Sequence, residues 1–378
     1  MQDTVGSTTR TVTIAVLLAA ALAACASGSG GGAAPDNTPQ PGGTPTSGRI
    51  NSTWPVTTRL HIDLWLHGYA MVQEDTTLIP FFKRGYAEQM RSLKSRANAT
   101  TQLELNRDRL RARLALNAGL INAQFLALSF STWETMARAL DVFLQAEGDP
   151  NRSSDRQTQM VIAAVAQYFP AAADREWLRI FLVSLKDEHD VFYRAYWTRE
   201  QQDRQPTLVR VDSLWEQMYR PKLNRYLNNS QLDAGTFYLS LPLNGEGRTM
   251  TGGTREETAI TATFPESPSA AIEAIYVFAH EAIIAVAATA VRDNTTPVEA
   301  RSGLSDRYNA VGAVRGGAML LKRAAPEIHD GYMRYYLQSA NVVPPSTNLE
   351  AAFLRTFPLP QGILDAITRQ LDIVLGGI

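Results

Sequence analysis

Residues 26–48 limit how much of this chain can fold. They read ASGSGGGAAPDNTPQPGGTPTSG, so nearly every residue is Gly, Ser, Pro, Thr or Ala. This composition buries too little apolar surface to offset the entropy lost on ordering, and it is typical of flexible tethers. We therefore expect a disordered linker over residues 25–53, followed by one large, mainly helical domain over residues 54–378.

An apolar run at residues 12–22 precedes this linker. A membrane-spanning helix needs roughly 20 apolar residues, so this shorter run is typical of a secretory signal peptide, here residues 1–24. The run ends at Leu22-Ala23-Ala24-Cys25, which holds the only cysteine of the chain. This segment resembles the lipobox of bacterial lipoproteins, whose cysteine is acylated after cleavage. The alternative is an ordinary signal peptide with a cysteine near its cleavage site.

The lipobox resemblance implies where the protein acts. Cys25 would carry the lipid, and two or three acyl chains would anchor the protein stably to a bacterial membrane in the cell envelope. Ala26 is not acidic, which by the same resemblance favours an outer membrane, on its periplasmic or surface side. Besides the membrane, peptides or envelope proteins are the partners that this location allows.

Charge and motifs exclude several classes of protein. Lys and Arg number 36 and Asp and Glu number 37, so the net charge of -1 gives no support for a nucleic-acid partner. A single cysteine excludes an intrachain disulfide and a cysteine-rich zinc site. The sequence contains no GxSxG, Walker or dinucleotide-binding pattern. A Ser–His–acid triad stays open, although no pattern favours one.

Hydrophobic patterning predicts the fold class. Apolar periodicity predicts helices over residues 59–72, 86–97, 103–130, 132–146, 157–168, 174–204, 208–228, 269–291, 305–325, 327–339 and 362–374. Ser131 with Glu134, and separately Asp174, predict helix N-caps. Two strands, at 235–243 and 258–264, enclose a glycine-rich loop. The prediction is a mostly α protein with a small inserted β-sheet (α+β).

For two predicted helical stretches, the sequence must be examined for whether they lie in a membrane, in the protein core or in solvent. Residues 270–291 are apolar enough to suggest a transmembrane helix. They include Glu273, His280 and Glu281, and a charge at the centre of a membrane helix costs roughly 2.5–3.5 kcal/mol even on lenient scales, so we expect a buried helix of the folded domain. The charge-rich stretch at residues 186–190 is expected to be a solvated helix face.

The candidate chemistry lies on the apolar helix, in the segment VFAHEAII that contains His280 and Glu281. A strand, a glycine-rich loop and an apolar helix bearing His-Glu resemble the active-site segment of zincin metallopeptidases, whose motif is HExxH. The resemblance covers residues 235–294, in a zincin-like part at about 208–340. It implies that His280 binds zinc and that Glu281 is the general base. Ile284 occupies the position of the second histidine, so the standard ligand set is broken.

Three interpretations of this pair remain open: a zincin-like domain that has lost catalytic zinc, a site in which another residue replaces the missing ligand, or two polar residues paired in a helical core. The replacement metal ligands would be Glu299, 19 residues after His280, or Glu327. His329 and Tyr332 could stabilise an oxyanion. Asp63 and His67 share one helix face at i, i+4 and could hold a metal together.

The missing second histidine favours a non-catalytic, metallopeptidase-like envelope lipoprotein, that is, a pseudoenzyme. One alternative is an active zinc-dependent peptidase with an atypical ligand set, so zinc stays open as a cofactor. The other alternative is a purely structural or partner-binding envelope protein.

Overall fold

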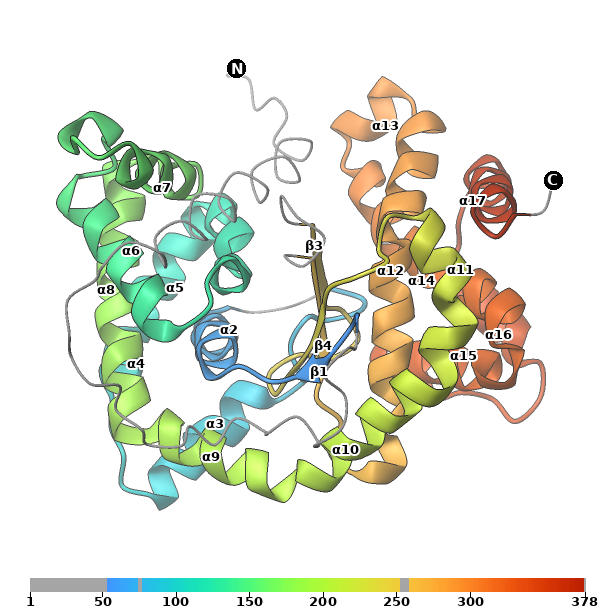
Figure 1. The fold of residues 1–378 in the computed structure, drawn as a ribbon, viewed down its shortest axis with the longest axis horizontal. Coiled ribbons are helices and arrows are strands. Elements are labelled where there is room, and N and C mark those ends of the chain that lie inside the picture. The colour runs from blue at the N-terminus through green and yellow to red at the C-terminus, as the bar shows by residue number, and fades with distance from the viewer. Residues whose placement is uncertain (1–52, 74–76, 252–257, 377–378) are drawn as a thin grey trace.

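The computed structural model describes residues 53–73, 77–251 and 258–376. Helices make up most of this part, and one four-stranded sheet lies near its centre (Figure 1). The predicted fold class, mostly α with a small β-sheet, is confirmed. The signal peptide, the lipobox with Cys25 and nearly all of the predicted linker lie outside the described residues.

The helices form two groups on opposite sides of the sheet (Figure 1). The N-terminal group contains α2 (Leu60–Val72), α3 (Tyr86–Arg96), α4 (Gln102–Leu105), α5 (Arg107–Leu116), α6 (Trp133–Gln145) and α7 (Arg156–Ala166). The C-terminal group contains α12 (Ile272–Asp293), α13 (Pro297–Arg301), α14 (Leu304–Ala324), α15 (His329–Ser339), α16 (Leu349–Thr356) and α17 (Gln361–Val374).

An arc of consecutive helices connects the two groups (Figure 1). Its members are α8 (Ala172–Glu188), η5 (His189–Tyr193), α9 (Arg194–Asp203), α10 (Gln205–Leu214), η6 (Trp215–Tyr219) and α11 (Arg220–Asn229). The segments η5 and η6 are single π-helical turns. Such turns are common where a helix bends. Glu188, directly before η5, is fully buried.

The sheet has the strand order β1-β2-β4-β3. Its strands are β1 (Val56–Thr57), β2 (Thr236–Ser240), β3 (Arg248–Met250) and β4 (Ala259–Thr263). The two predicted strands are β2 and β4, and they pair in parallel. The short strands β1 and β3 were not predicted, since two or three residues carry too little pattern. β3 pairs antiparallel with β4 and forms one edge of the sheet.

Several predicted element boundaries were wrong. The helix predicted over 103–130 is broken after α5, because the Asn117 side chain accepts a hydrogen bond from Gly119 N, at 3.0 Å, and 3₁₀ turns follow. Thr132, not Ser131, caps α6. Asp174 lies inside α8 rather than at its N-cap, and accepts from the backbone N–H of Ala171 at 3.4 Å. The helix α16 was not predicted.

The apolar helix α12 is a core element. It packs against β4, α14 and α17, and His280 and Glu281 lie on its buried surface. Among the described residues, one helical segment, Pro268–Asp293, is long and apolar enough to cross a membrane, and 78% of its apolar window is buried in the domain. The buried helix expected from the sequence is therefore what the structure contains.

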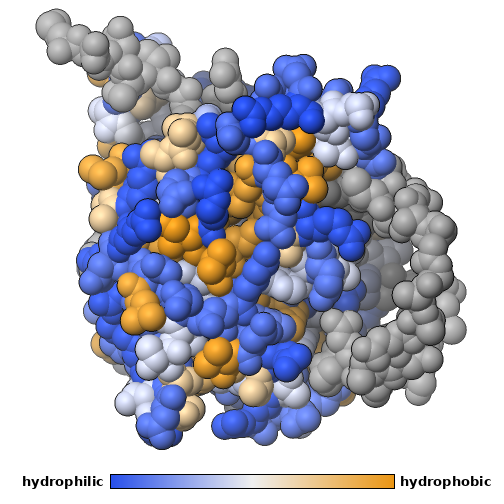
Figure 2. Space-filling model, turned by 90° about the vertical axis from the view of Figure 1, so that its left-hand side faces the viewer, coloured by the Kyte–Doolittle hydropathy of each residue, from blue (hydrophilic) through white to orange (hydrophobic). Residues whose placement is uncertain are grey.

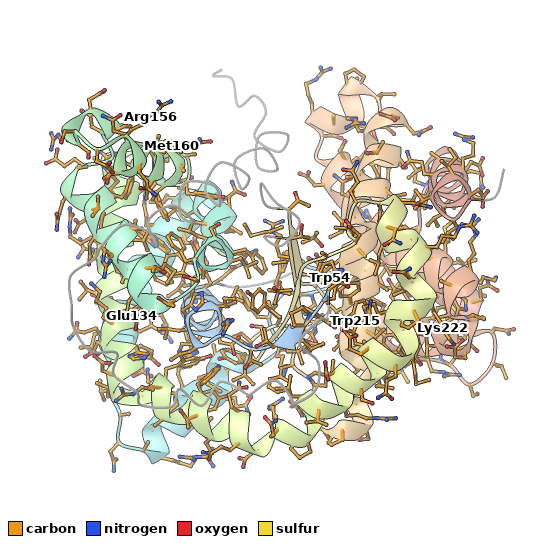
Figure 3. All side chains as sticks on the ribbon, in the orientation of Figure 1. Trp54, Glu134, Arg156, Met160, Trp215 and Lys222 are labelled. Atoms are coloured by element: carbon orange, nitrogen blue, oxygen red, sulfur yellow. The ribbon has the colours of Figure 1, made fainter. Side chains whose placement is uncertain are left out.

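Two tryptophans attach the start of the domain to this core (Figure 3). Trp54 is 1% exposed, and its ring centroid lies 5.3 Å from that of Phe278 on α12. Trp215 lies 4.2 Å from the same ring and donates its indole N–H to the carbonyl of Trp54 at 3.1 Å. Far from this core, the face that lies on the left in Figure 1 is mostly hydrophilic, with scattered apolar residues (Figure 2).

Candidate functional site

His280 and Glu281 lie on the side of α12 that faces β3. Their residues are 2% and 1% exposed. Glu281 Oε1 accepts hydrogen bonds from the backbone N–H of Gly247, at 3.0 Å, and from Nδ1 of His280, at 3.0 Å. The hydroxyl of Thr249 on β3 donates to the carbonyl of Glu281 at 2.9 Å. The pair therefore fastens the core helix to the edge of the sheet.

Tyr336 of α15 covers the other side of the pair. Its ring stacks on His280 with the centroids 5.3 Å apart and the planes at 19°. Its hydroxyl donates to the carbonyl of Gly245 at 2.9 Å, which ties α15 to the loop before β3. Because a carboxylate oxygen accepts, Nδ1 of His280 is the donor in its hydrogen bond to Glu281. His280 Nε2 and Glu281 Oε2 are buried and have no hydrogen-bond partner among the described residues.

The nitrogen and oxygen atoms of His280 and Glu281 do not form a zinc site. A zinc site takes three or four protein ligands in tetrahedral geometry, whereas the pair offers two unpartnered atoms, and the other two polar atoms bond to each other. Across residues 53–73, 77–251 and 258–376, no group of three His, Cys, Asp or Glu side chains is placed to hold a metal. Ile284, one turn on, is aliphatic.

The predicted replacement ligands have other roles. Glu299 caps α13 at the surface, where its Oε2 accepts from the backbone N–H of Thr296 at 2.9 Å. Glu327 forms an exposed ion pair with Lys222, whose position Figure 3 shows. Neither carboxylate lies beside His280, so the structure does not bring the predicted ligands together.

The predicted oxyanion stabilisers also lie in other surroundings. The buried hydroxyl of Tyr332 donates to the carbonyl of Val314 at 3.0 Å, and burial raises the pKa of Tyr332 well above its ordinary value. Nδ1 of His329 lies 3.5 Å from the exposed carboxylate of Asp330. Neither residue presents a donor beside Glu281, so the structure does not support this role for them.

Asp63 and His67 are both buried on α2, but they face different partners. Asp63 accepts hydrogen bonds from Ser240 Oγ (2.5 Å), Leu241 N (3.2 Å) and Trp197 Nε1 (2.8 Å). Burial raises the pKa of Asp63 to about 7, although these hydrogen bonds lower it. Asp63 thus attaches α2 to β2 and α9 instead of sharing a metal with His67.

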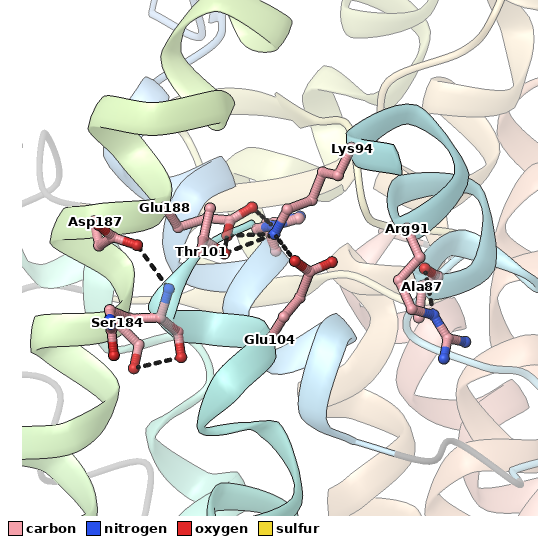
Figure 4. A network of polar contacts seen from close by, with 10 residues as sticks. Ala87, Arg91, Lys94, Thr101, Glu104, Ser184, Asp187 and Glu188 are labelled. Carbon is pink, nitrogen blue, oxygen red and sulfur yellow. Dashed lines mark hydrogen bonds and ion pairs between the residues drawn. The ribbon is translucent and has the colours of Figure 1, made fainter. Parts of the chain in front are cut away.

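Lys94, Thr101, Glu104 and Glu188 form a buried polar network that the sequence analysis did not find (Figure 4). His67 also belongs to this network. His67 Nε2 lies 3.0 Å from Glu188 Oε1, and Lys94 Nζ lies 2.7 Å from Glu188 Oε2. Thr101 also donates to this carboxylate, and Glu104 lies 3.4 Å from Lys94. The network joins α2, α3, α4 and α8, and it buries Glu188, which the charge-rich stretch had predicted to be solvated.

The protonation states in this network follow from its geometry. Burial lowers the pKa of His67, so at neutral pH its ring is neutral, donating from Nε2 to Glu188 and accepting at Nδ1 from the Tyr86 hydroxyl, 3.0 Å away. Burial alone would raise the pKa of Glu188, but the hydrogen bonds from His67 and Lys94 and the positive charge of Lys94 outweigh it and lower that pKa. Glu188 is therefore a buried carboxylate with donors on both oxygens. His67 donates to Oε1, and Lys94 and Thr101 donate to Oε2.

No protein-family model, no curated protein and no solved structure matches this chain.

Proposed function

We propose that the protein is a lipid-anchored component of the bacterial cell envelope, built on a metallopeptidase-like scaffold, which acts by binding rather than by catalysis. One observation carries the non-catalytic part of this proposal. His280 and Glu281 are closed off from solvent and bonded to each other and to Gly247. A general base must reach a water or a substrate proton, and Glu281 has no such access.

The neighbourhood of the pair supports the metallopeptidase-like ancestry. The resemblance rests on a strand, a glycine-rich loop and a helix bearing His-Glu. In the structure, the edge strand β3 lies next to α12, and the loop residue before it, Gly247, donates to Glu281. A scaffold that keeps this arrangement while lacking a second histidine is what a pseudoenzyme would contain. An active peptidase with atypical ligands would need a third donor at the pair, and none of the described residues supplies one.

The metal content of the full chain tests the non-catalytic proposal. We expect less than stoichiometric zinc by mass spectrometry of protein purified without chelators or a His tag. His280→Ala should leave that value unchanged and lower the free energy of unfolding by about 1–3 kcal/mol, because Glu281 loses a buried donor. His329→Ala is the control, since His329 pairs with an exposed carboxylate. One zinc per chain that disappears in His280→Ala would contradict the proposal.

The lipid anchor is tested separately at Cys25. Replacing Cys25 by serine removes the only thiol that the acyl group could join. We expect labelled fatty acid to be incorporated into the natural chain and to be absent from the variant, which should accumulate as uncut precursor or as released protein. Ser27→Ala, in the same linker, should be labelled normally. Unchanged labelling and membrane retention of Cys25→Ser would rule out the anchor.

A further inference from the structure

The five lysines of the chain differ in the partners of their ammonium groups. All five lie within the described residues, and four of them form an ion pair with a carboxylate. These four pairs are Lys94 with Glu188 at 2.7 Å, Lys186 with Asp141 at 3.2 Å, Lys322 with Glu350 at 3.3 Å, and Lys222 with Glu327. The fifth, Lys83, forms no ion pair with any described residue, and its Nζ donates to the neutral carbonyl of Phe264 at 3.2 Å.

Lys83 shares this acceptor with a second cation. Nη1 of Arg204, at the C-cap of α9, donates to the same carbonyl of Phe264 at 3.1 Å and to that of Pro265 at 3.2 Å. Nε of Arg204 donates to Glu200 at 2.9 Å, which leaves Nη2 without a partner among the described residues. An ammonium and a guanidinium on one oxygen repel each other, so this position favours the neutral amine of Lys83.

Lys83 lies at the carboxyl ends of the parallel strands β2 and β4. Phe264 directly follows β4, and the backbone N–H of Lys83 donates to the carbonyl of Pro242, which follows β2, at 2.9 Å. The residue is half-buried in this position. A reagent that reacts with its Nζ must therefore be small.

The surroundings of Lys83 change its protonation. Burial and the charge of Arg204 lower the pKa of Lys83 from 10.5 to about 8, although Glu266, Glu200 and Glu273 lie near enough to raise it. At pH 8, the neutral fraction of this amine is therefore about a hundred times that of an ordinary lysine. The neutral form is the nucleophile, so Lys83 is the lysine best suited to react near neutral pH.

We propose that Lys83 binds carbon dioxide covalently, as a carbamate on Nζ that pairs with Arg204. The lone pair of the neutral amine attacks the carbon of CO2, an N–C bond forms, one C=O π-bond opens to give the carboxylate, and the surplus proton leaves to solvent. The product keeps one N–H, which can still donate to Phe264. Its negative charge turns the repulsion by Arg204 into attraction, next to the unpartnered Nη2.

Other modifications of this nitrogen fit the site less well. Acylation would also remove the charge of Lys83, but it would give Arg204 no anionic partner, and most acyl donors are larger than CO2. The proposal goes beyond the binding role proposed above and depends on neither the lipid anchor nor the His280 pair. Its failure would leave the tests of those proposals unaffected.

Trapping with ¹³C-labelled carbon dioxide tests the proposal on the full chain in detergent. The protein is equilibrated at a fixed partial pressure of the labelled gas and treated with triethyloxonium ion, which converts carbamates to stable ethyl esters. Peptide mass spectrometry then locates the label and separates Lys83 from the α-amino group of the chain, which also reacts near pH 8. We expect at least about tenfold more label at Lys83 than at any other lysine, rising with pH through about 8.

Two variants separate the amine from its counter-ion. Lys83→Arg keeps a cationic donor to Phe264 but cannot form the carbamate, so the label at this position should disappear. Arg204→Gln removes the cation that favours the neutral amine and pairs with the product, and it should lower the label at Lys83 about tenfold, the equivalent of one charged hydrogen bond. Lys186→Arg is the control, because Lys186 already has a carboxylate partner, and it should leave the label at Lys83 unchanged.

Three results would overturn the proposal. The first is the absence of label at Lys83 in the natural chain, and the second is equal label on all five lysines, which would show only the general reaction of amines. The third is label at Lys83 that Arg204→Gln leaves unchanged in a variant whose thermal unfolding shows that it is folded. The mapping on the natural chain decides the first two without any variant.

Discussion

Replacing Lys94 by methionine should lower the free energy of unfolding by about 3–5 kcal/mol, the range for removing one partner of a buried ion pair. Lys94 is fully buried, and its Nζ lies 2.7 Å from Glu188 and 2.7 Å from Thr101. Methionine retains most of the side-chain length but no charge, so the carboxylate of Glu188 stays buried with its ammonium partner gone. Chemical denaturation of the purified protein would measure the loss.

Lys186→Met is the control for this experiment. Lys186 lies on α8, as Glu188 does, but its ion pair with Asp141 is about half exposed on both sides. Exposed pairs of this kind contribute about 0–1 kcal/mol. The double variant Lys94→Met/Glu188→Gln should recover part of the loss, because the unpaired charge is gone. Equal effects of Lys94→Met and Lys186→Met would contradict the buried network.

The pH dependence of stability offers an independent check. The pKa of Glu188 is lowered in the folded protein from an ordinary value of 4.5, so its contribution is fully present above pH 4.5 and is lost as the pH falls through the lowered pKa. The pKa of Asp63 is raised from 3.8 to about 7, so its ionisation costs stability as the pH rises through that range, and the effect is nearly absent below pH 4. Glu188→Gln should therefore flatten the acid limb of the stability curve below pH 4.

Gly247→Ala should be the second most damaging substitution, with a loss of about 3 kcal/mol, at the upper end of the range for overpacked cores. A Cβ at this position would overlap the backbone carbonyl oxygen of Thr261 on β4 and would crowd Glu281 Cγ at 3.3 Å. A backbone atom in a paired strand cannot rotate away as a side chain can. Any shift that relieves the overlap also disturbs the hydrogen bond from Gly247 N to Glu281.

Gly312→Ala is the matched control for this substitution. Gly312 is also buried, but its added Cβ would meet Ala287 and Val291 at 3.6 and 3.7 Å, which are ordinary contacts. Gly312 lies inside α14, where alanine is favoured over glycine by up to about 1 kcal/mol. The two glycine variants should therefore shift the melting temperature in opposite directions. A Gly247→Ala protein as stable as the natural chain would contradict the close approach of β3 to β4.

The helical part of the fold could be predicted where apolar periodicity was long and uninterrupted. The predicted helix at 269–291 corresponds to α12, Ile272–Asp293. The elements that were missed or misplaced depend on short or local features: β1 has two residues and β3 has three. The break after α5 depends on one side chain, that of Asn117, folding back on its own backbone.

The surroundings of the candidate residues could not be predicted from the sequence, because their partners are distant along the chain. The sequence indicated that the helix bearing His280 and Glu281 would be buried, and it left their pairing in a helical core as one of three interpretations. It did not indicate that Gly247, 34 residues away, would donate to Glu281. Lys94 and Glu188 are 94 residues apart and stand on helices with many other charges. Local pattern assigns such residues to solvent, and only tertiary packing selects the two that are buried.

The position of Trp54 has a mechanical consequence. The chain enters the domain at Trp54 and β1, and both are held at its centre, against Trp215, Phe278 and β2. A tension applied N-terminal to Trp54 would therefore be carried directly by the aromatic core and by the parallel pairing of β1 with β2, and not by a peripheral helix. If the linker is attached to a membrane, each pull on it would load the same core that contains His280 and Glu281.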